Sequence, residues 1–157
     1  MIDGIDAKIV TILQSDGRTP NAEIARQVNL APSAVFERVR KLEERGVLRG
    51  YTALVDYAAV GVGLLAFVLV RSTEPTGTDH VAKLIAKAPE VLEVHNVAGD
   101  DCYVVKVRAR DTKDLSRILK KRFGAAKAVR STRTIIALDT IKESTIVPVS
   151  AEQSDDT

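Results

Sequence analysis

The chain has 157 residues, of which 45% are hydrophobic and 28% charged, and its formal net charge at pH 7 is +2. This composition is typical of a protein that buries a core, and an aromatic content of 4% without any Trp disfavours the base-stacking surfaces that bind single-stranded nucleic acid. The longest apolar stretch, residues 60–70, is too short to span a bilayer, and the first six residues lack the pattern of a secretory signal, so we expect one or two small domains in a cytoplasmic protein with no membrane partner.

The N-terminal third begins with two predicted helices. In the first helix, which Asp3 is expected to cap and residues 16–17 to end, apolar residues recur at i, i+4, i+7 and i+8. These residues are Ile5, Ile9, Ile12 and Leu13. In the second helix, Thr19 is the expected cap and Pro20 takes the first position. Its inward residues are Ile24, Ala25 and Val28.

A third helix is predicted to open at Pro32, directly after a tight turn at residues 29–30. Its inward residues repeat at i, i+4 and i+7, and Gly46 supplies its C-terminal stop. They are Val35, Val39 and Leu42. Two helices joined by so short a turn form a helix-turn-helix.

Residues 47–55 follow the third helix and are rich in side chains that favour β-structure. With Gly50 inside the run, this segment predicts a short strand pair that packs beside the helices as a wing. The N-terminal domain is therefore expected to be a winged helix-turn-helix, and Arg49 would lie beside the DNA backbone.

The outward face of the third helix has short polar side chains near its start and basic ones beyond. It carries Ser33, Ala34, Glu37, Arg38, Arg40, Lys41 and Arg45. A recognition helix needs small or hydrogen-bonding groups at base edges and cations at phosphates. An ordinary solvated face with i, i+4 charge pairs, such as Arg40 with Glu44, is the alternative. The three-helix spacing with a following strand pair favours the recognition helix.

Beyond residue 63 strands and helices alternate. The expected elements are a strand at 64–71, a helix at 80–88, strands at 91–98 and 102–108, a helix at 114–123 and a strand at 129–141. Asp79 is the expected cap of the first of these helices, and Asp111 or Thr112 lies near the start of the second. The order βαββαβ predicts an α+β, ferredoxin-like domain with both helices on one face of an antiparallel sheet. Self-association would cover the other, apolar face.

The expected domain organisation has four parts. They are a winged helix-turn-helix domain at 1–55, a linker at 56–63, the ferredoxin-like domain at 64–145 and a polar tail at 146–157, disordered from Val149 on.

The segments from Ala31 to Glu43 and from Gly46 to Tyr51 resemble the signature of the Lrp/AsnC family, the feast/famine transcription regulators, and so does the Asp-Gly-Arg run that ends at Arg18. The family usually has a Ser where this chain has Ala31. The resemblance implies a regulator that binds double-stranded DNA at promoters. The expected DNA-binding residues are Arg18, Ser33, Ala34, Glu37, Arg38, Arg40, Lys41 and Arg49.

The C-terminal half resembles the family's amino-acid-sensing domain through residues 89–91, 97–103 and 131–136. The resemblance implies a homo-oligomer, a dimer that assembles further into an octamer, and a small-molecule effector such as an amino acid between dimers. The expected effector-binding residues are His95, Gly99, Asp100, Asp101 and Thr134. A carboxylate can hold an α-ammonium group and the N–H groups of a glycine turn can hold an α-carboxylate, although an Asp-rich hairpin turn is the simpler alternative. The family often has Asp where this chain has Cys102.

The sequence offers little for catalysis. Its single cysteine cannot form an intramolecular disulfide or a thiolate cluster for zinc, its two histidines, His80 and His95, lack metal-ligand spacing, and it contains no phosphate-binding or nucleophile motif. We therefore expect no cofactor, no metal and no enzymatic activity. The enzyme alternative is a sirohaem-decarboxylase-like protein on the same two domains. A DNA-free amino-acid-binding module is a third possibility that leaves the basic residues of the third helix unexplained.

Overall fold

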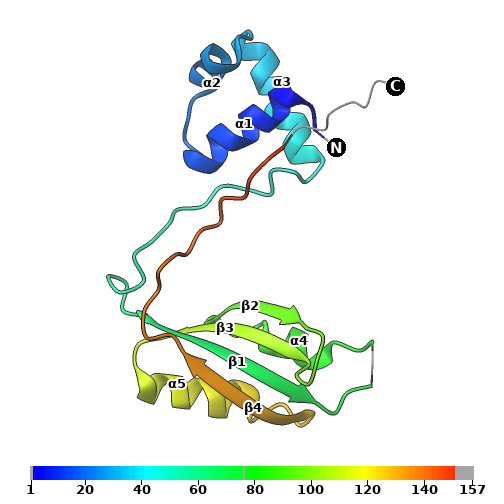
Figure 1. Ribbon diagram of the computed structural model, residues 1–157, viewed down its shortest axis with the longest axis vertical. Helices are drawn as coiled ribbons and strands as arrows, with labels where there is room; N and C mark the ends of the chain where they lie inside the picture. Colours follow the sequence, from blue (N-terminus) through cyan, green and yellow to red (C-terminus); the bar gives the residue numbers. More distant parts are fainter. Residues whose placement is uncertain (1, 76, 151–157) are drawn as a thin grey trace. The chain divides into compact units, whose positions relative to one another are not determined.

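Residues 2–75 and 77–150 of the computed structural model are described here (Figure 1). Their contacts divide them into two compact units: a helical unit, residues 2–54 with 142–150, and a sheet unit, residues 55–141. The sequence predicted a separate linker at 56–63 and a sensing domain that ends at 145. By contacts, residues 56–63 group with the sheet unit and residues from 142 on group with the helical unit.

The helical unit contains α1 (Gly4–Ser15), α2 (Asn21–Val28) and α3 (Pro32–Glu44). Asp3 caps α1 as predicted, because its carboxylate accepts from the N–H groups of Ile5 and Asp6 at 2.9 and 2.8 Å. The prediction for Thr19 was wrong. Its hydroxyl donates to the carbonyl of Asp16, and α2 starts after Pro20 without a side-chain cap. Asn29 takes the left-handed conformation (φ 57°) that ends α2 and makes the tight turn before α3.

The core of the helical unit is aliphatic and comes from all three helices. Its buried members are Ile9, Val10, Leu13, Ile24, Ala25, Val35 and Leu42. Four of these have no exposed surface, which fits the inward faces that the helical periods predicted. The three helices therefore confirm the predicted helix-turn-helix.

The predicted wing has no strands in the described chain. Residues 45–63 contain turns and irregular backbone but no ladder of hydrogen bonds. A strand needs a partner that accepts its backbone hydrogen bonds, and β-forming side chains alone do not supply one. The segment remains close to the helices, since Leu48 packs on their core.

The C-terminal segment of the helical unit contacts α1. The side-chain amide of Gln14 donates to the carbonyl of Val147 at 3.0 Å and accepts from the N–H of Val147 at 2.9 Å. Val149 is half-buried and packs against the core of the three helices. The prediction of a disordered tail was therefore wrong for Val149, while residues 151–157 lie outside the described part of the chain.

The sheet unit confirms the predicted βαββαβ order. Its strands are β1 (Leu64–Ser72), β2 (Val91–Asn96), β3 (Tyr103–Ala109) and β4 (Val129–Ile136), and its helices are α4 (His80–Ile85) and α5 (Thr112–Ile118). The strands form one antiparallel sheet in the order β2-β3-β1-β4. The last strand ends five residues before the predicted end at 141.

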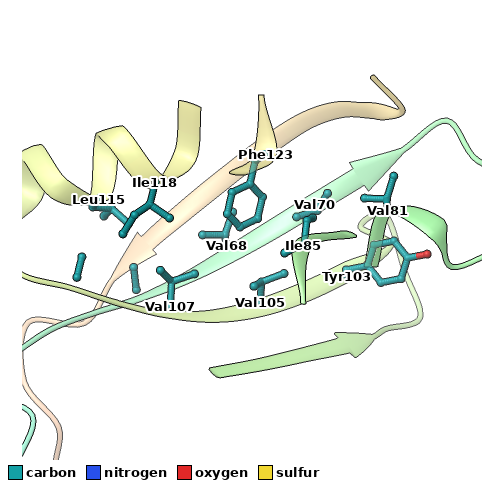
Figure 2. Close-up of a cluster of buried hydrophobic side chains, with 12 residues drawn as sticks. Val68, Val70, Val81, Ile85, Tyr103, Val105, Val107, Leu115, Ile118 and Phe123 are labelled. Atoms are coloured by element: carbon teal, nitrogen blue, oxygen red, sulfur yellow. The ribbon is translucent and has the colours of Figure 1, made fainter. Parts of the chain in front are cut away.

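One face of this sheet is covered by the helices. Figure 2 shows Val68 and Val70 of β1 with Val105 and Val107 of β3 beneath Ile118 and Phe123. Alternate residues of β1 and its neighbouring strands point to the opposite face, where the apolar side chains are partly buried or exposed. They include Phe67, Leu69, Val104 and Ile135. The open apolar face that the sequence predicted is therefore present.

Both helices of the sheet unit differ in detail from the prediction. The Asp79 side chain does not cap α4; it pairs with Lys83 at 2.9 Å, and the carboxylate of Glu74 instead accepts from the N–H of Val81 at 3.1 and 3.2 Å. The expected helix at 114–123 splits into α5, which Asp111 caps, and one π-helical turn, η1 (Leu119–Phe123). A Cβ on Gly124 would lie 2.7 Å from the carbonyl oxygen of Lys120, so glycine is required where this turn closes.

Candidate nucleic-acid interface and ligand cavity

The outward face of α3 is the first candidate site. Pro32 occupies the first turn, and Val35 and Leu42 turn that side of the helix into the core, so the other side faces solvent. The exposed residues on it include Ser33, Phe36, Glu37, Arg40 and Lys41, while Ala34 is half-buried. This order places small side chains on the first turn of the helix and cations on the later turns, as major-groove contact requires.

Arg40 is held between two carboxylates on this face. Its guanidinium contacts Glu37 one turn before it at 2.8 Å and Glu44 one turn after it. The Arg40 hydrogen bond is the main reason that the pKa of Glu37 lies below its ordinary value. All three side chains are about half exposed, so a phosphate could replace either carboxylate at little cost.

Arg38 pairs with the start of α1 and also lines a surface cavity beside Glu37 and Lys41 of the outward face. Its Nη1 donates to Asp3 Oδ2 at 2.7 Å and to Asp6 Oδ1 at 2.8 Å, and both aspartates come from the start of α1. The N–H of Asp6 and the guanidinium of Arg38 hold the pKa of the Asp3 carboxyl below its ordinary value. The Asp3 carboxylate thus caps α1 and also binds Arg38 of α3. The DNA contact predicted for Arg38 stays a prediction, and its two ion pairs also give it a role in orienting α3 on α1.

The two remaining predicted DNA-binding residues flank the helices. Arg18 lies in the turn between α1 and α2, and Arg49 follows α3; both side chains are exposed. Near Arg49 the Tyr51 hydroxyl donates to Glu43 of α3 at 3.0 Å. This hydrogen bond ties the segment after α3 back to the helix, so Arg49 is held near the interface without a wing strand.

The second candidate site is a cavity of about 410 Å³ in the sheet unit. Its lining comes from the end of β1, the start of β4 and the turn between β2 and β3: Arg71, Asp100, Asp101, Ser131, Thr132 and Arg133. Gly99 begins this turn at φ +117°, a conformation that favours glycine. The turn comes back to β1 because the N–H of Cys102 donates to the carbonyl of Val70 at 2.8 Å.

The structure brings together only part of the predicted effector site. Asp100 and Asp101 line the cavity, next to Gly99. His95 lies on β2 opposite Val104, where its ring contacts Glu93 at 3.1 Å, and Thr134 pairs with Val68 and so faces the helix-covered side. Cys102 does not line the cavity, since its sulfur accepts from the N–H of Ser72 at 3.4 Å.

Five residues of these sites were missed by sequence reasoning. Four of them, Arg71, Ser131, Thr132 and Arg133, line the cavity from the paired strands β1 and β4, and Phe36 is 54% exposed on α3. Phe36 could have been found from the helical period, because it falls outside the i, i+4, i+7 series of the core. Identifying the two arginines requires the pairing of β1 with β4, in which Arg71 lies opposite Ser131 and Leu69 lies opposite Arg133.

Two further properties concern the described chain as a whole. Within residues 2–75 and 77–150, no group of three or more His, Cys, Asp or Glu side chains is arranged to hold a metal ion. Nor does any helix in these ranges have the length and apolar content needed to cross a membrane.

Two family models match the chain, one for each unit. Residues 2–43 match the AsnC-type helix-turn-helix domain, and residues 65–147 match the Lrp/AsnC ligand binding domain. The chain belongs to the Lrp/AsnC family. This assignment makes it a transcriptional regulator of the Lrp/AsnC type with a helix-turn-helix domain.

Curated relatives support the family assignment along nearly the whole chain. The HTH-type transcriptional regulator FL11 of Pyrococcus horikoshii is 41% identical over 148 residues, which cover 94% of this chain and 97% of the relative. The leucine-responsive regulatory protein of Escherichia coli K12 is 34% identical over 145 residues, which cover 91% of this chain and 88% of the relative.

Solved structures of similar proteins share the fold. A transcriptional regulator of Neisseria meningitidis in complex with L-Met has a TM-score of 0.87 at 30% identity, over 94% of this chain and 97% of that one. The feast or famine regulatory protein of M. tuberculosis complexed with L-methionine has a TM-score of 0.86 at 36% identity, over 94% of this chain and 99% of that one. Both of those regulators were therefore solved with an amino acid bound.

Proposed function

We propose that this Lrp/AsnC regulator binds double-stranded promoter DNA by placing α3 in the major groove, as a dimer or higher oligomer whose activity an amino acid or related small molecule modulates. The observation that carries the proposal is the outward face of α3, where Ser33, Phe36 and Lys41 remain exposed after the core and the ion pairs have been accounted for. The relatives are described as transcriptional regulators, which favours this function over a tetrapyrrole enzyme.

Within the groove, the residues divide by chemistry. Ser33 and Glu37 carry groups that hydrogen-bond to base edges, and Phe36 offers an apolar surface that suits the C5-methyl group of thymine. Lys41, Arg18 and Arg49 are exposed cations, suited to phosphate oxygens at the edges of the groove. Arg40 joins the phosphate contacts by exchanging a carboxylate for a phosphate.

Footprinting on the promoter region beside the protein's own gene tests the DNA-binding half. A protected segment of duplex is expected, and it should shift or change in strength when pooled amino acids are added. Absence of any protected duplex at micromolar protein and low salt would refute the DNA-binding function.

Uracil in place of thymine tests the role of Phe36 within the protected segment. Removing the C5-methyl group at the contacted step should weaken binding of the parent severalfold, whereas Phe36→Ala should bind both duplexes equally. Phe36→Leu is the matched control, because it keeps an apolar side chain and should keep part of the preference. If uracil weakens DNA binding by the same factor in the parent and in Phe36→Ala, another residue makes the methyl contact.

Subunit pairing is proposed to use the open face of the sheet. The half-buried Phe67 and Leu69 lie on it beside Val104, and leaving such a surface in water is unfavourable. Phe67→Glu should convert the full chain to monomers in light scattering, and Leu84→Glu is the matched control on the exposed side of α4. A Phe67→Glu protein with the parent's mass would rule out this face as the interface. The octamer remains an expectation from the family.

A further inference from the structure

The turn at Gly99 was predicted to hold an amino acid with a carboxylate on its ammonium group, and the geometry argues against Asp101 in that role. Asp101 Oδ1 lies 3.4 Å from Arg71 Nε, and Asp101 Oδ2 lies 3.3 Å from Arg133 Nη2. Each carboxylate oxygen thus already has a guanidinium partner, and the Asp101 side chain is only 17% exposed. An ammonium group brought to Asp101 would compete with two cations, which is electrostatically unfavourable.

The two arginines retain donors that Asp101 does not use. A guanidinium has five N–H groups in a planar fork, and Asp101 occupies one nitrogen of each arginine. The Arg71 side chain is 49% exposed and that of Arg133 is 68% exposed, and both line the cavity. Ser131, which lies opposite Arg71, adds a hydroxyl group to the same lining. This set of donors suits carboxylate oxygens.

The charge of the cavity leads to the same ligand class. The lining holds two arginines and two aspartates, and its three charged side chains other than the solvated Asp100, namely Arg71, Arg133 and Asp101, leave one positive charge. The remaining acid, Asp100, has a side chain that is 93% exposed and lies 3.7 Å from Arg71, so solvent screens it. A neutral amino acid brings no net charge to this cavity, whereas aspartate or glutamate brings one negative charge and a second carboxylate.

We propose that the cavity selects an acidic amino acid, whose two carboxylates bind Arg71 and Arg133 while its ammonium group lies toward the exposed Asp100. Asp101 is then a positioning residue that holds the two guanidinium groups side by side and does not touch the ligand. The inference rests on the proposed function, since it names the ligand class of the site through which an amino acid would act.

Calorimetry on the full chain tests the selection with isosteric pairs. L-aspartate and L-glutamate are expected to bind at least tenfold more tightly than L-asparagine and L-glutamine, which have the same shape but lack the second charge. Arg133→Gln should abolish this preference. Arg130→Gln is the matched control, because Arg130 is an exposed arginine of β4 outside the cavity lining and should leave the preference intact. A thermal melt confirms that each variant is folded.

The role of Asp101 is tested with 2-oxoglutarate, which has both carboxylates of glutamate but no ammonium group. If Asp101 positions the arginines, Asp101→Asn changes the affinities for glutamate and 2-oxoglutarate by the same factor. If Asp101 holds the ammonium group, Asp101→Asn weakens glutamate alone, and the assignment is overturned.

The outcomes also separate this inference from the proposed function. Binding of L-leucine or L-methionine as tight as that of the acids would overturn the acidic selection and leave an amino-acid effector in place. Failure of all twenty amino acids to bind would overturn the inference together with the effector half of the proposed function. The DNA footprint tests the other half independently.

Discussion

Two clusters of arginine and aspartate, one in each unit of the molecule, differ in the ratio of the two residues. In the helical unit one arginine, Arg38, serves two aspartates, Asp3 and Asp6, and its side chain is 32% exposed. In the sheet unit two arginines, Arg71 and Arg133, share Asp101, and Arg71 also lies 3.7 Å from the solvated Asp100; both arginine side chains are about half exposed or more. The first cluster carries an excess of negative charge, whereas the second is formally neutral and one of its two carboxylates, Asp100, is 93% exposed.

The ratio of arginines to aspartates decides which cluster keeps N–H donors for a binding partner. Arg38 directs one nitrogen at two carboxylates and lies against the helices, so its contribution goes to the geometry of α3. Arg71 and Arg133 share a carboxylate and keep several N–H groups toward a cavity, so their contribution can go to a ligand. Counting partners around each guanidinium therefore separates a structural arginine from a binding one.

The largest expected effect is that of Arg38→Ala on stability. The substitution leaves Asp6, which is only 8% exposed, without its cation, and we expect the free energy of unfolding to fall by about 2 to 3 kcal/mol. Urea unfolding at pH 7 measures this loss. The dependence of DNA affinity on salt should keep its slope, because no phosphate contact is removed.

Arg26→Ala is the matched control for this first prediction. Arg26 forms a surface ion pair with Glu23 within α2, its side chain is 78% exposed, and its loss should cost less than about 0.5 kcal/mol. If Arg38→Ala unfolds as the parent does and lowers the salt slope, Arg38 is a phosphate contact and the contrast between the two clusters disappears.

The same change in both clusters gives the second prediction. Asp6→Asn and Asp101→Asn each replace a carboxylate by an amide beside arginine. The first should lower the free energy of unfolding by about 1 to 2 kcal/mol, because Asp6 is buried and joins two helices. The second should lower it by less than about 0.5 kcal/mol, because its arginines are solvated. Equal losses in urea unfolding would show that the cavity cluster is as structural as the helical one.

Exposed lysines of the helical unit give the third prediction. Lys41→Ala removes a cation from the outward face of α3 and should reduce the slope of log affinity against log salt by about 1. Lys8→Ala removes the same charge from the exposed side of α1 and should leave the slope unchanged. Fluorescence anisotropy across a salt series measures both, and an equal change in the two variants would mean that net charge alone sets affinity.

The smallest expected effect concerns a third arginine–aspartate cluster, on α5. Hydrogen bonds from Arg117 and then Arg110 hold the pKa of the Asp114 carboxyl far below its ordinary value. Since the folded-state pKa is depressed, the stabilisation is present above the unfolded-state pKa of about 4 and is lost as the pH falls below it. Asp114→Asn should therefore show a shallower loss of stability between pH 4 and pH 2 than the parent. Parallel curves would mean that Asp114 contributes nothing to this dependence.

Much of the fold could be predicted from the spacing of apolar residues. Val35 and Leu42 repeat at the helical period and are fully buried, and Val68 and Val70 alternate in β1 and face the helices. The absence of wing strands could not be predicted, because residues 47–55 have the composition of a strand while strand pairing depends on a second segment. The split of the last helix into α5 and η1 depends on the close packing at Gly124, which composition does not reveal.

The candidate sites were predicted less completely than the fold. The sequence identified α3 and the turn at Gly99, since both lie in continuous motifs. It did not reveal the ion pairs of Arg38, because only the packing of α1 on α3 brings Asp3 and Asp6 to it. It chose Thr134 over Arg133, because neighbouring residues of a strand point to opposite faces and only the pairing with β1 decides which one reaches the cavity.

The contact between Gln14 and Val147 has a consequence for synthesis on the ribosome. The first 54 residues emerge early, but the segment that packs on α1, residues 142–150, is made only after the whole sheet unit. At about 5 to 20 residues per second, a ribosome takes several seconds to cover that interval. During this time α1 lacks the backbone partner of Gln14 and the apolar cover of Val149. A chain released before residue 142 therefore lacks both of these contacts on α1, although its three helices have all been made.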